Sequence, residues 1–131
     1  MDKKQVEIHS ETDIVLARRL ARTMAESLGF SVMGKTRIAT AVSELARNVY
    51  QHGGGGSMLL ETINQQNRLG LQCVFIDQGP GIADITMAMM DGYSTGNTLG
   101  HGLPGSKRLV DEFEIHSEVG KGTQVKIVKW K

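Results

Sequence analysis

The chain has 131 residues, the size of one domain, and its composition of 40% hydrophobic and 22% charged residues is ordinary for a globular protein. A formal net charge of +1 gives no electrostatic reason to expect a nucleic acid or an anionic membrane as partner, and no long apolar run or leader indicates insertion or export. We therefore expect a single domain over residues 1–131 that works in the cytoplasm on a protein or a small ligand.

The N-terminal part of the chain predicts a strand and a helix. Polar and apolar residues alternate at about residues 4–9, which indicates a short strand. Apolar residues then recur with the helical period from Ile14 to Leu28. Thr12 or Asp13 is the expected N-cap of this helix, and Gly29 is expected to lie just past its end.

A second helix is expected to begin after Ser31, which can cap it, and to end before four consecutive glycines at residues 53–56. One face of this helix carries regularly spaced apolar residues, which predicts that it faces the core. These residues are Ile38, Val42, Leu45 and Val49.

The rest of the chain predicts a hairpin, a loop, a further helix and two more strands. Residues 58–63 and 69–76 have strand composition and are joined by the polar run 64–68. Residues 84–99 mix methionine with glycine, serine and threonine, as a loop does. The remaining elements are a helix at about 103–112 and strands at about 113–117 and 124–129. Together these elements predict an α+β two-layer sandwich, with a mixed, mostly antiparallel sheet and helices on one face.

Two polar residues of the second helix, Glu44 and Asn48, lie four positions apart and therefore share a face. They fall about 100–140° from the apolar stripe, so they border the core. An asparagine there can offer an oxygen to Mg²⁺, and a carboxylate one turn earlier can take a proton from an attacking hydroxyl. The alternative is an ordinary polar flank, in which Glu44 pairs with Arg47 or Arg37.

A second candidate site follows the strand at 69–76, where Asp77 is followed by Gly79 and Gly81. Glycines let the backbone approach a flat ring closely, and an ionised carboxylate accepts the hydrogen bond that the amino group of adenine donates. Guanine has a carbonyl at that position, so this arrangement favours adenine. The alternative is an exposed turn, because aspartate, glycine and proline are common turn residues.

A third candidate site is the glycine-rich stretch from Gly100 to Gly105, which fits the pattern Gly-x-Gly-x-x-Gly. The dinucleotide-binding interpretation fails, because neither a strand before it nor an acidic residue about 20 positions later is predicted. A protein-kinase glycine loop fails as well, because its partner motifs are missing. The remaining interpretation is a phosphate cradle, in which Pro104 opens a helix and Lys107 and Arg108 add positive charge. The alternative is that Lys107 and Arg108 are ordinary solvent-exposed residues of this helix.

Four motifs in this order resemble the N, G1, G2 and G3 boxes of the GHKL ATPases, which share the Bergerat fold. They are Ser43–Asn48, Asp77–Ile82, Gly100–Gly105 and Gly120–Thr123. Within that superfamily the chain is most similar to the small serine/threonine kinases of the anti-sigma-factor group, and among these to the switch kinase of the bacterial stressosome. The likeness covers nearly the whole chain.

The resemblance implies a role for each motif. Asn48 would coordinate Mg²⁺, Asp77 would bind the adenine amino group, and Glu44 would be the base toward the acceptor hydroxyl. The loop at 84–99 would be the ATP lid. Nucleotide contacts are implied for Gly79, Gly81, Gly100, Gly102, Leu103, Gly105 and Thr123. One departure is that Thr98 and Leu99 stand where related anti-sigma factors tend to carry an arginine that reaches the terminal phosphate.

The resemblance implies an ATP-dependent serine/threonine kinase that phosphorylates a sulfate-transporter-and-anti-sigma-antagonist (STAS) domain in a stress-signalling partner switch. The released kinase would then activate a phosphatase of the PP2C type. The alternative is an anti-sigma factor that sequesters a sigma subunit, with nucleotide serving mainly to order its surface. A scaffold that binds no nucleotide is a third possibility.

Overall fold

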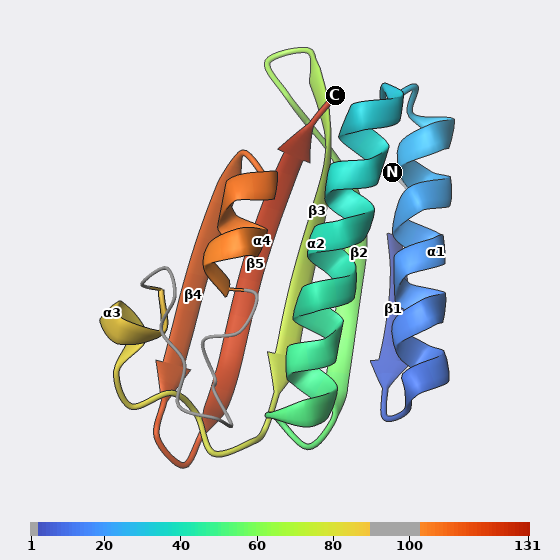
Figure 1. The fold of residues 1–131 in the computed structure, drawn as a ribbon. Coiled ribbons are helices and arrows are strands. Elements are labelled where there is room, and N and C mark those ends of the chain that lie inside the picture. Colours follow the sequence, from blue (N-terminus) through green and yellow to red (C-terminus); the bar gives the residue numbers. More distant parts are fainter. Residues whose placement is uncertain (1–2, 90–102) are drawn as a thin grey trace.

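The computed structural model describes residues 3–89 and 103–131 and shows one sheet with helices on one face (Figure 1). The strand order is β1-β2-β3-β5-β4. In chain order the elements are β1 (Lys3–Ile8), α1 (Glu11–Ser27), α2 (Val32–Gln51), β2 (Gly56–Gln65), β3 (Arg68–Asp77), α3 (Ile85–Ala88), α4 (Leu103–Leu109), β4 (Glu112–Glu118) and β5 (Gly122–Trp130). The α+β two-layer class predicted from the sequence is confirmed.

The sheet differs from the prediction in one respect, since each pairing among the described strands is antiparallel rather than mixed. The reason lies in the connection from β3 to β4. These two strands run in the same direction, but β5 lies between them and pairs with both. The long connection therefore produces no parallel pair.

Helix α1 begins earlier than predicted, because Ser10 rather than Thr12 or Asp13 is its N-cap. The Oγ of Ser10 accepts a hydrogen bond from the Asp13 amide at 3.2 Å. The Asp13 carboxylate in turn accepts from the amide of His9, the residue before the cap, at 2.9 Å. Gly29 follows the helix with a φ of +87°, as expected for a residue just past a helix end.

Helix α2 lies beside α1 on the same face of the sheet (Figure 1). Its predicted apolar stripe is confirmed as buried. Ser31 caps this helix by accepting from the Gly34 amide at 3.0 Å. The core lies between these helices and the sheet, and the Cys73 thiol is buried within it. No helix in the described part of the chain combines the length and apolar character needed to cross a membrane.

The hairpin between β2 and β3 is tighter than predicted. Its loop is only Gln66 and Asn67, whose φ angles are +54° and +65°. Positive φ at both loop residues is typical of a type I′ turn, which matches the twist of paired strands. The polar residues on either side of the loop therefore continue the ladder.

The second half of the chain contains two short helices. Residues 85–88 form α3, a single turn within the region predicted as a loop, and residues 90–99 of that region lie outside the described residues. Helix α4 ends at Leu109, earlier than predicted, because Asp111 binds the sheet. The Asp111 amide donates to the Val128 carbonyl at 2.9 Å, and its carboxylate accepts from the Trp130 amide at 2.7 Å.

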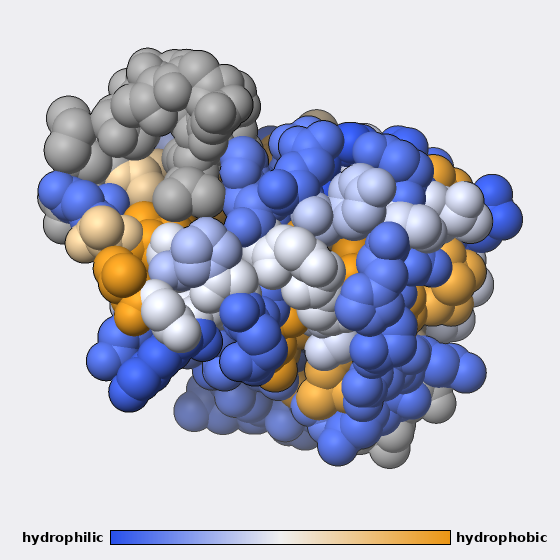
Figure 2. Space-filling model, turned by 90° about the horizontal axis from the view of Figure 1, so that it is seen from below, coloured by the Kyte–Doolittle hydropathy of each residue, from blue (hydrophilic) through white to orange (hydrophobic). Residues whose placement is uncertain are grey.

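Strand β3 and helix α2 finish at the same end of the molecule, and α2 lies over the sheet there (Figure 1). Figure 2 looks onto this end, where hydrophilic surface predominates and hydrophobic surface is confined to separate patches. The end of β3 places Asp77, and the last turns of α2 place Asn48, in the same part of the structure.

Candidate functional site

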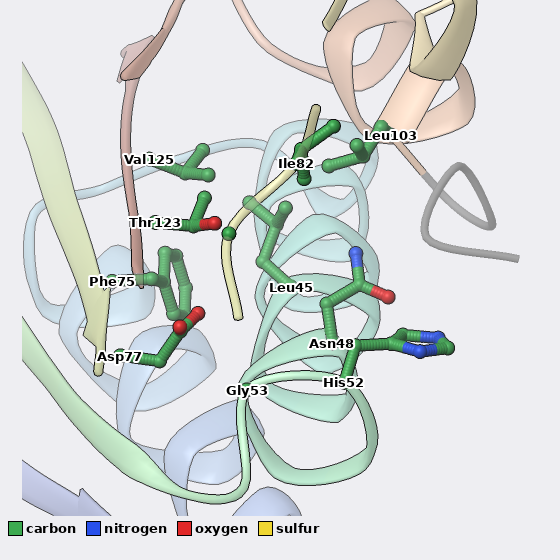
Figure 3. Close-up of a pocket in the computed structure, with 11 residues that line it drawn as sticks. Leu45, Asn48, His52, Gly53, Phe75, Asp77, Ile82, Leu103, Thr123 and Val125 are labelled. Atoms are coloured by element: carbon green, nitrogen blue, oxygen red, sulfur yellow. The ribbon is translucent and has the colours of Figure 1, made fainter. Parts of the chain in front are cut away.

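A cavity opens between α2 and the ends of β3 and β5 (Figure 3). Counted with its open mouth, which includes solvent, its volume is about 440 Å³. Small-molecule sites are mostly apolar with a few polar groups. The cavity fits this description. Its walls are Leu45, Asn48, His52, Gly53, Phe75, Asp77, Gly81, Ile82, Leu103, Thr123 and Val125.

Asp77 is the carboxylate of this cavity and is only 9% exposed. Its Oδ1 accepts a hydrogen bond from the Gly79 amide at 2.9 Å. Burial raises the pKa of Asp77 above its usual range, because it penalises the charged form. Hydrogen bonds from the backbone amides of Gly79 and Thr123 act in the opposite direction and support the ionised form. The exposed-turn alternative therefore does not describe this residue.

Glycines around Asp77 allow three backbone segments to meet there. A Cβ on Gly53 would lie 2.6 Å from the Cβ of Asp77, and a Cβ on Gly79 would lie 2.7 Å from the Cα of Gly53. Gly122 has a φ of +95°, and a Cβ there would overlap the Asp77 carbonyl oxygen. The glycines after α2 therefore do more than end the helix, since Gly53 forms part of the cavity wall beside the carboxylate.

Asn48 lines the cavity from α2, on the wall opposite the β3 residue Asp77 (Figure 3). Its Nδ2 is buried and has no hydrogen-bond partner in the described part of the chain. An amide left in this state is costly unless a ligand or water completes it. The side chain therefore has an unused hydrogen-bonding group beside the cavity.

Glu44 lies one turn before Asn48, is half-buried, and is not part of the cavity wall. The predicted alternative, an ion pair with Arg47 or Arg37, is not formed. Arg47 instead pairs with Glu11 of α1 at 3.4 Å, and no described ion pair includes Glu44. The structure therefore places Asn48 and Asp77 at the cavity and Glu44 at its side.

The third predicted motif is only partly described, since Gly100 and Gly102 lie outside the described residues. Leu103 is 2% exposed and lines the cavity. Among the described residues, a Cβ on Gly105 would approach nothing closer than the Arg108 side chain at 4.0 Å, so packing against them does not require a glycine there. Lys107 and Arg108 are exposed and occupy the last turn of α4, because the helix ends earlier than predicted.

Gly81 and Thr123 also contribute to the wall, whereas Gly79 supports Asp77 from outside it. Gly81 has a φ of +77°, and a Cβ there would overlap the Glu118 carbonyl oxygen. The loop after β3 is held by the hairpin between β4 and β5, where the Gly120 amide donates to the Pro80 carbonyl at 2.8 Å.

Sequence reasoning missed several residues of the cavity wall. The glycine run was the available signal for Gly53. Leu45 and Ile82 lie within recognised motifs but were not named as contacts, whereas Phe75 and Val125 are indistinguishable in sequence from other core positions. Those that were missed are Leu45, His52, Gly53, Phe75, Ile82 and Val125.

Among the described residues, no group of three or more histidine, cysteine or acidic side chains is placed to hold a metal ion. The amide oxygen of Asn48 is a hard donor, which suits Mg²⁺ when nucleotide phosphates and water provide the other ligands.

Comparison with known proteins agrees with this geometry. A family model described as histidine kinase-like ATPase domain matches residues 9–129. The serine/threonine-protein kinase RsbT of Bacillus subtilis is 48% identical over 129 residues, which cover 98% of this chain and 97% of that protein. The anti-sigma F factors of a Thermoanaerobacter species and of Caldanaerobacter subterraneus are 32% and 30% identical over 120 residues, 87% of this chain and 82% of each.

These findings confirm the resemblance that the four motifs indicated, and with it the interpretation as an ATP-dependent serine/threonine kinase. The anti-sigma factors among the relatives belong to the group expected from the same motifs. The chain belongs to the histidine kinase-like ATPase family and, within it, is similar to the kinase RsbT.

Proposed function

We propose that this chain, as a single domain over residues 1–131, transfers the γ-phosphate of ATP to a serine or threonine of a STAS-domain protein. The observation that carries the proposal is the cavity in which the buried Asp77 carboxylate lies opposite the unpartnered amide of Asn48. A buried acceptor and an incomplete amide on facing walls are suited to a ligand with a donor at one end and acceptors at the other. ATP has this character.

Asp77 would accept a hydrogen bond from the adenine amino group. The apolar side chains of Phe75 and Val125 line the same cavity and would contact the flat ring. The Gly79 amide already holds one carboxylate oxygen, which fixes the orientation of the other. The carboxylate would therefore be positioned before the nucleotide arrives.

Asn48 would hold Mg²⁺ through its amide oxygen, while its Nδ2, unpartnered here, would donate to a phosphate oxygen. The metal would supply charge neutralisation on the phosphates. Leu103 would lie beside the nucleotide, and Gly100, Gly102 and Gly105 would cradle its phosphates.

Glu44 would act as the base toward the acceptor hydroxyl. It lies one turn from Asn48 on α2. It forms no ion pair with a described cation, since Arg47 pairs with Glu11 instead. In phosphoryl transfer such a residue mainly orients the attacking hydroxyl, since most of the catalysis is positioning and charge stabilisation.

The proposed partners are STAS-domain proteins of a cytoplasmic stressosome, which would be substrates, and a PP2C-type phosphatase, which the released kinase would activate. A phosphate placed in a packed protein interface adds charge that repels and must be desolvated. Phosphorylation would thus release the kinase from the scaffold. The similarity to RsbT supports this role in a partner switch.

The test is to incubate the protein with radiolabelled ATP, Mg²⁺ and a candidate STAS domain. We expect label on a serine or threonine of that domain, and its loss in Asn48→Ala and Asp77→Asn. Asn64→Ala, an exposed asparagine at the end of β2, is the matched control and should transfer label normally.

The second candidate is an anti-sigma factor, favoured by the relatives named anti-sigma F factor. In that case a sigma subunit would co-purify stoichiometrically, and no STAS domain would receive label. That pair of results would replace the kinase proposal with a binding function.

A further inference from the structure

Behind the cavity wall, the hydroxyl of Ser117 connects three backbone segments around Thr123. Ser117 lies on β4 directly opposite Thr123 on β5 and is not itself part of the wall. Its Oγ lies 2.7 Å from the Ile82 amide nitrogen, 3.1 Å from the Gly122 carbonyl oxygen and 2.8 Å from the Thr123 Oγ1. Two of these neighbours, Ile82 and Thr123, line the cavity.

The number of hydrogens determines how this group can be satisfied. A serine hydroxyl has one hydrogen to donate and two lone pairs to accept with. The Ile82 amide can only donate, so it takes one lone pair. The Gly122 carbonyl can only accept, so it takes the hydrogen. The remaining lone pair then accepts from the Thr123 hydroxyl, and all three neighbours are satisfied together.

In this arrangement the Thr123 hydroxyl donates to Ser117, away from the cavity, and turns its own lone pairs toward the cavity. Thr123 is paired with Asp77 in the sheet, and both side chains reach the same cavity (Figure 3). This part of the wall therefore presents acceptors from both residues. A ligand edge that donates a hydrogen bond is favoured here. An edge that presents a carbonyl is disfavoured, because its oxygen would face the oxygen lone pairs of the wall.

We infer that Ser117 is a positioning residue that orients the Thr123 hydroxyl and thereby makes the pocket select a purine with a 6-amino group over one with a 6-oxo group. The inference rests on the proposed function, because it assumes that the purine lies beside Asp77. Without Ser117, the Thr123 hydroxyl rotates freely and can donate to a 6-oxo group.

The experiment measures the dissociation constants of ATP and of inosine triphosphate by isothermal titration calorimetry. The wild type should prefer ATP. In Ser117→Ala that preference should fall about 3- to 10-fold, the range expected for the loss of one hydrogen bond. Ser117→Thr keeps the hydroxyl and suits a strand, so it should restore the preference. His116→Ala is the matched control, since this exposed neighbour lies on the opposite face of β4.

A double-mutant cycle separates positioning from general damage. Thr123→Val removes the group that Ser117 is inferred to orient. The Ser117→Ala change should therefore have no further effect on the ATP preference when it is added to Thr123→Val. A merely structural role would weaken both nucleotides equally in Ser117→Ala and leave their ratio unchanged, and this result overturns the inference.

The wild type distinguishes this failure from failure of the proposed function. If the wild type binds neither nucleotide, or binds both alike, the adenine site at Asp77 is wrong and the inference falls with it. If the wild type prefers ATP and Ser117→Ala prefers it to the same degree, the nucleotide site stands and only the role of Ser117 is wrong.

Discussion

Gly53 shows how one missing side chain determines the geometry of the site. Its substitution by alanine would place a Cβ 2.6 Å from that of Asp77, so either the loop or the carboxylate must move. We expect Gly53→Ala to lower the free energy of unfolding by about 1–3 kcal/mol, as overpacking does, and to weaken ATP binding at least about tenfold. Urea unfolding and calorimetric titration measure these two quantities.

Gly54 provides the control for this variant. It has a φ of +72°, but a Cβ there would meet no described atom within 4 Å. Gly54→Ala should therefore cost about 1 kcal/mol of stability through backbone strain and leave ATP affinity unchanged. Equal ATP affinities in Gly53→Ala and the wild type would show that Asp77 does not depend on the close approach of this loop.

The protonation of Asp77 predicts a pH dependence with a definite sign. Burial raises the pKa of Asp77 in the folded state above the usual 3.8 of the unfolded chain. In the pH window between these two pKa values, the folded protein therefore binds more protons than the unfolded chain. The apo protein therefore loses stability as the pH rises through the window, and Asp77→Asn should remove this loss. The measurement is urea unfolding of both proteins between the unfolded pKa and neutral pH. Identical pH profiles would contradict the assignment.

At the scale of the element, the start of α1 tests the capping found in the structure. Ser10→Ala removes an acceptor of the Asp13 amide and should cost about 1 kcal/mol of unfolding free energy. Thr12 was one of the caps predicted from the sequence, but it is exposed within the first turn. Thr12→Ala should change stability by less than about 0.5 kcal/mol. A larger loss in Thr12→Ala than in Ser10→Ala, measured by urea unfolding, would favour the predicted cap.

The elements themselves were largely predictable because their patterns are local. The stripe from Ile38 to Val49 and the apolar run before Asp77 each indicate one element without knowledge of the rest. The ends of elements were less predictable where tertiary contacts decide them. Helix α4 ends at Leu109 because Asp111 binds β5. Strand β5 comes after β4 in the chain, so no local sequence pattern predicts this contact.

At the scale of the whole molecule, the order of the motifs predicted Asn48 and Asp77 at the cavity but not most of the remaining wall. Asn48 and Asp77 belong to recognisable motifs, so they could be named from the sequence. Phe75 and Val125 follow the same apolar pattern as residues elsewhere in the core, and only the packing of α2 over β3 and β5 makes them a cavity wall. Ser117 likewise gains its role only because β4 pairs with β5.

Because the cavity lies between α2 and the sheet, a nucleotide bound there should stabilise the whole fold. A ligand that binds only the folded state adds RT ln(1 + [L]/Kd), about 2.7 kcal/mol when its concentration is 100 times the Kd. For a domain of this size that corresponds to several degrees in Tm. Thermal unfolding of the wild type should therefore shift upward with Mg²⁺ and ATP and return when both are removed by dialysis.

Asp77→Asn should unfold at the same temperature with and without the nucleotide. A carboxylate has two acceptor oxygens, whereas an asparagine side chain has one oxygen and an NH2 group, which would face the donors that the carboxylate accepts from. Asn64→Ala should keep the full shift, because its side chain is exposed at the far end of β2. A shift that persists undiminished in Asp77→Asn would place the nucleotide elsewhere on the molecule. If the Tm shift is lost in Asp77→Asn but kept in Asn64→Ala, the nucleotide stabilises the helices and the sheet through the carboxylate at the end of β3.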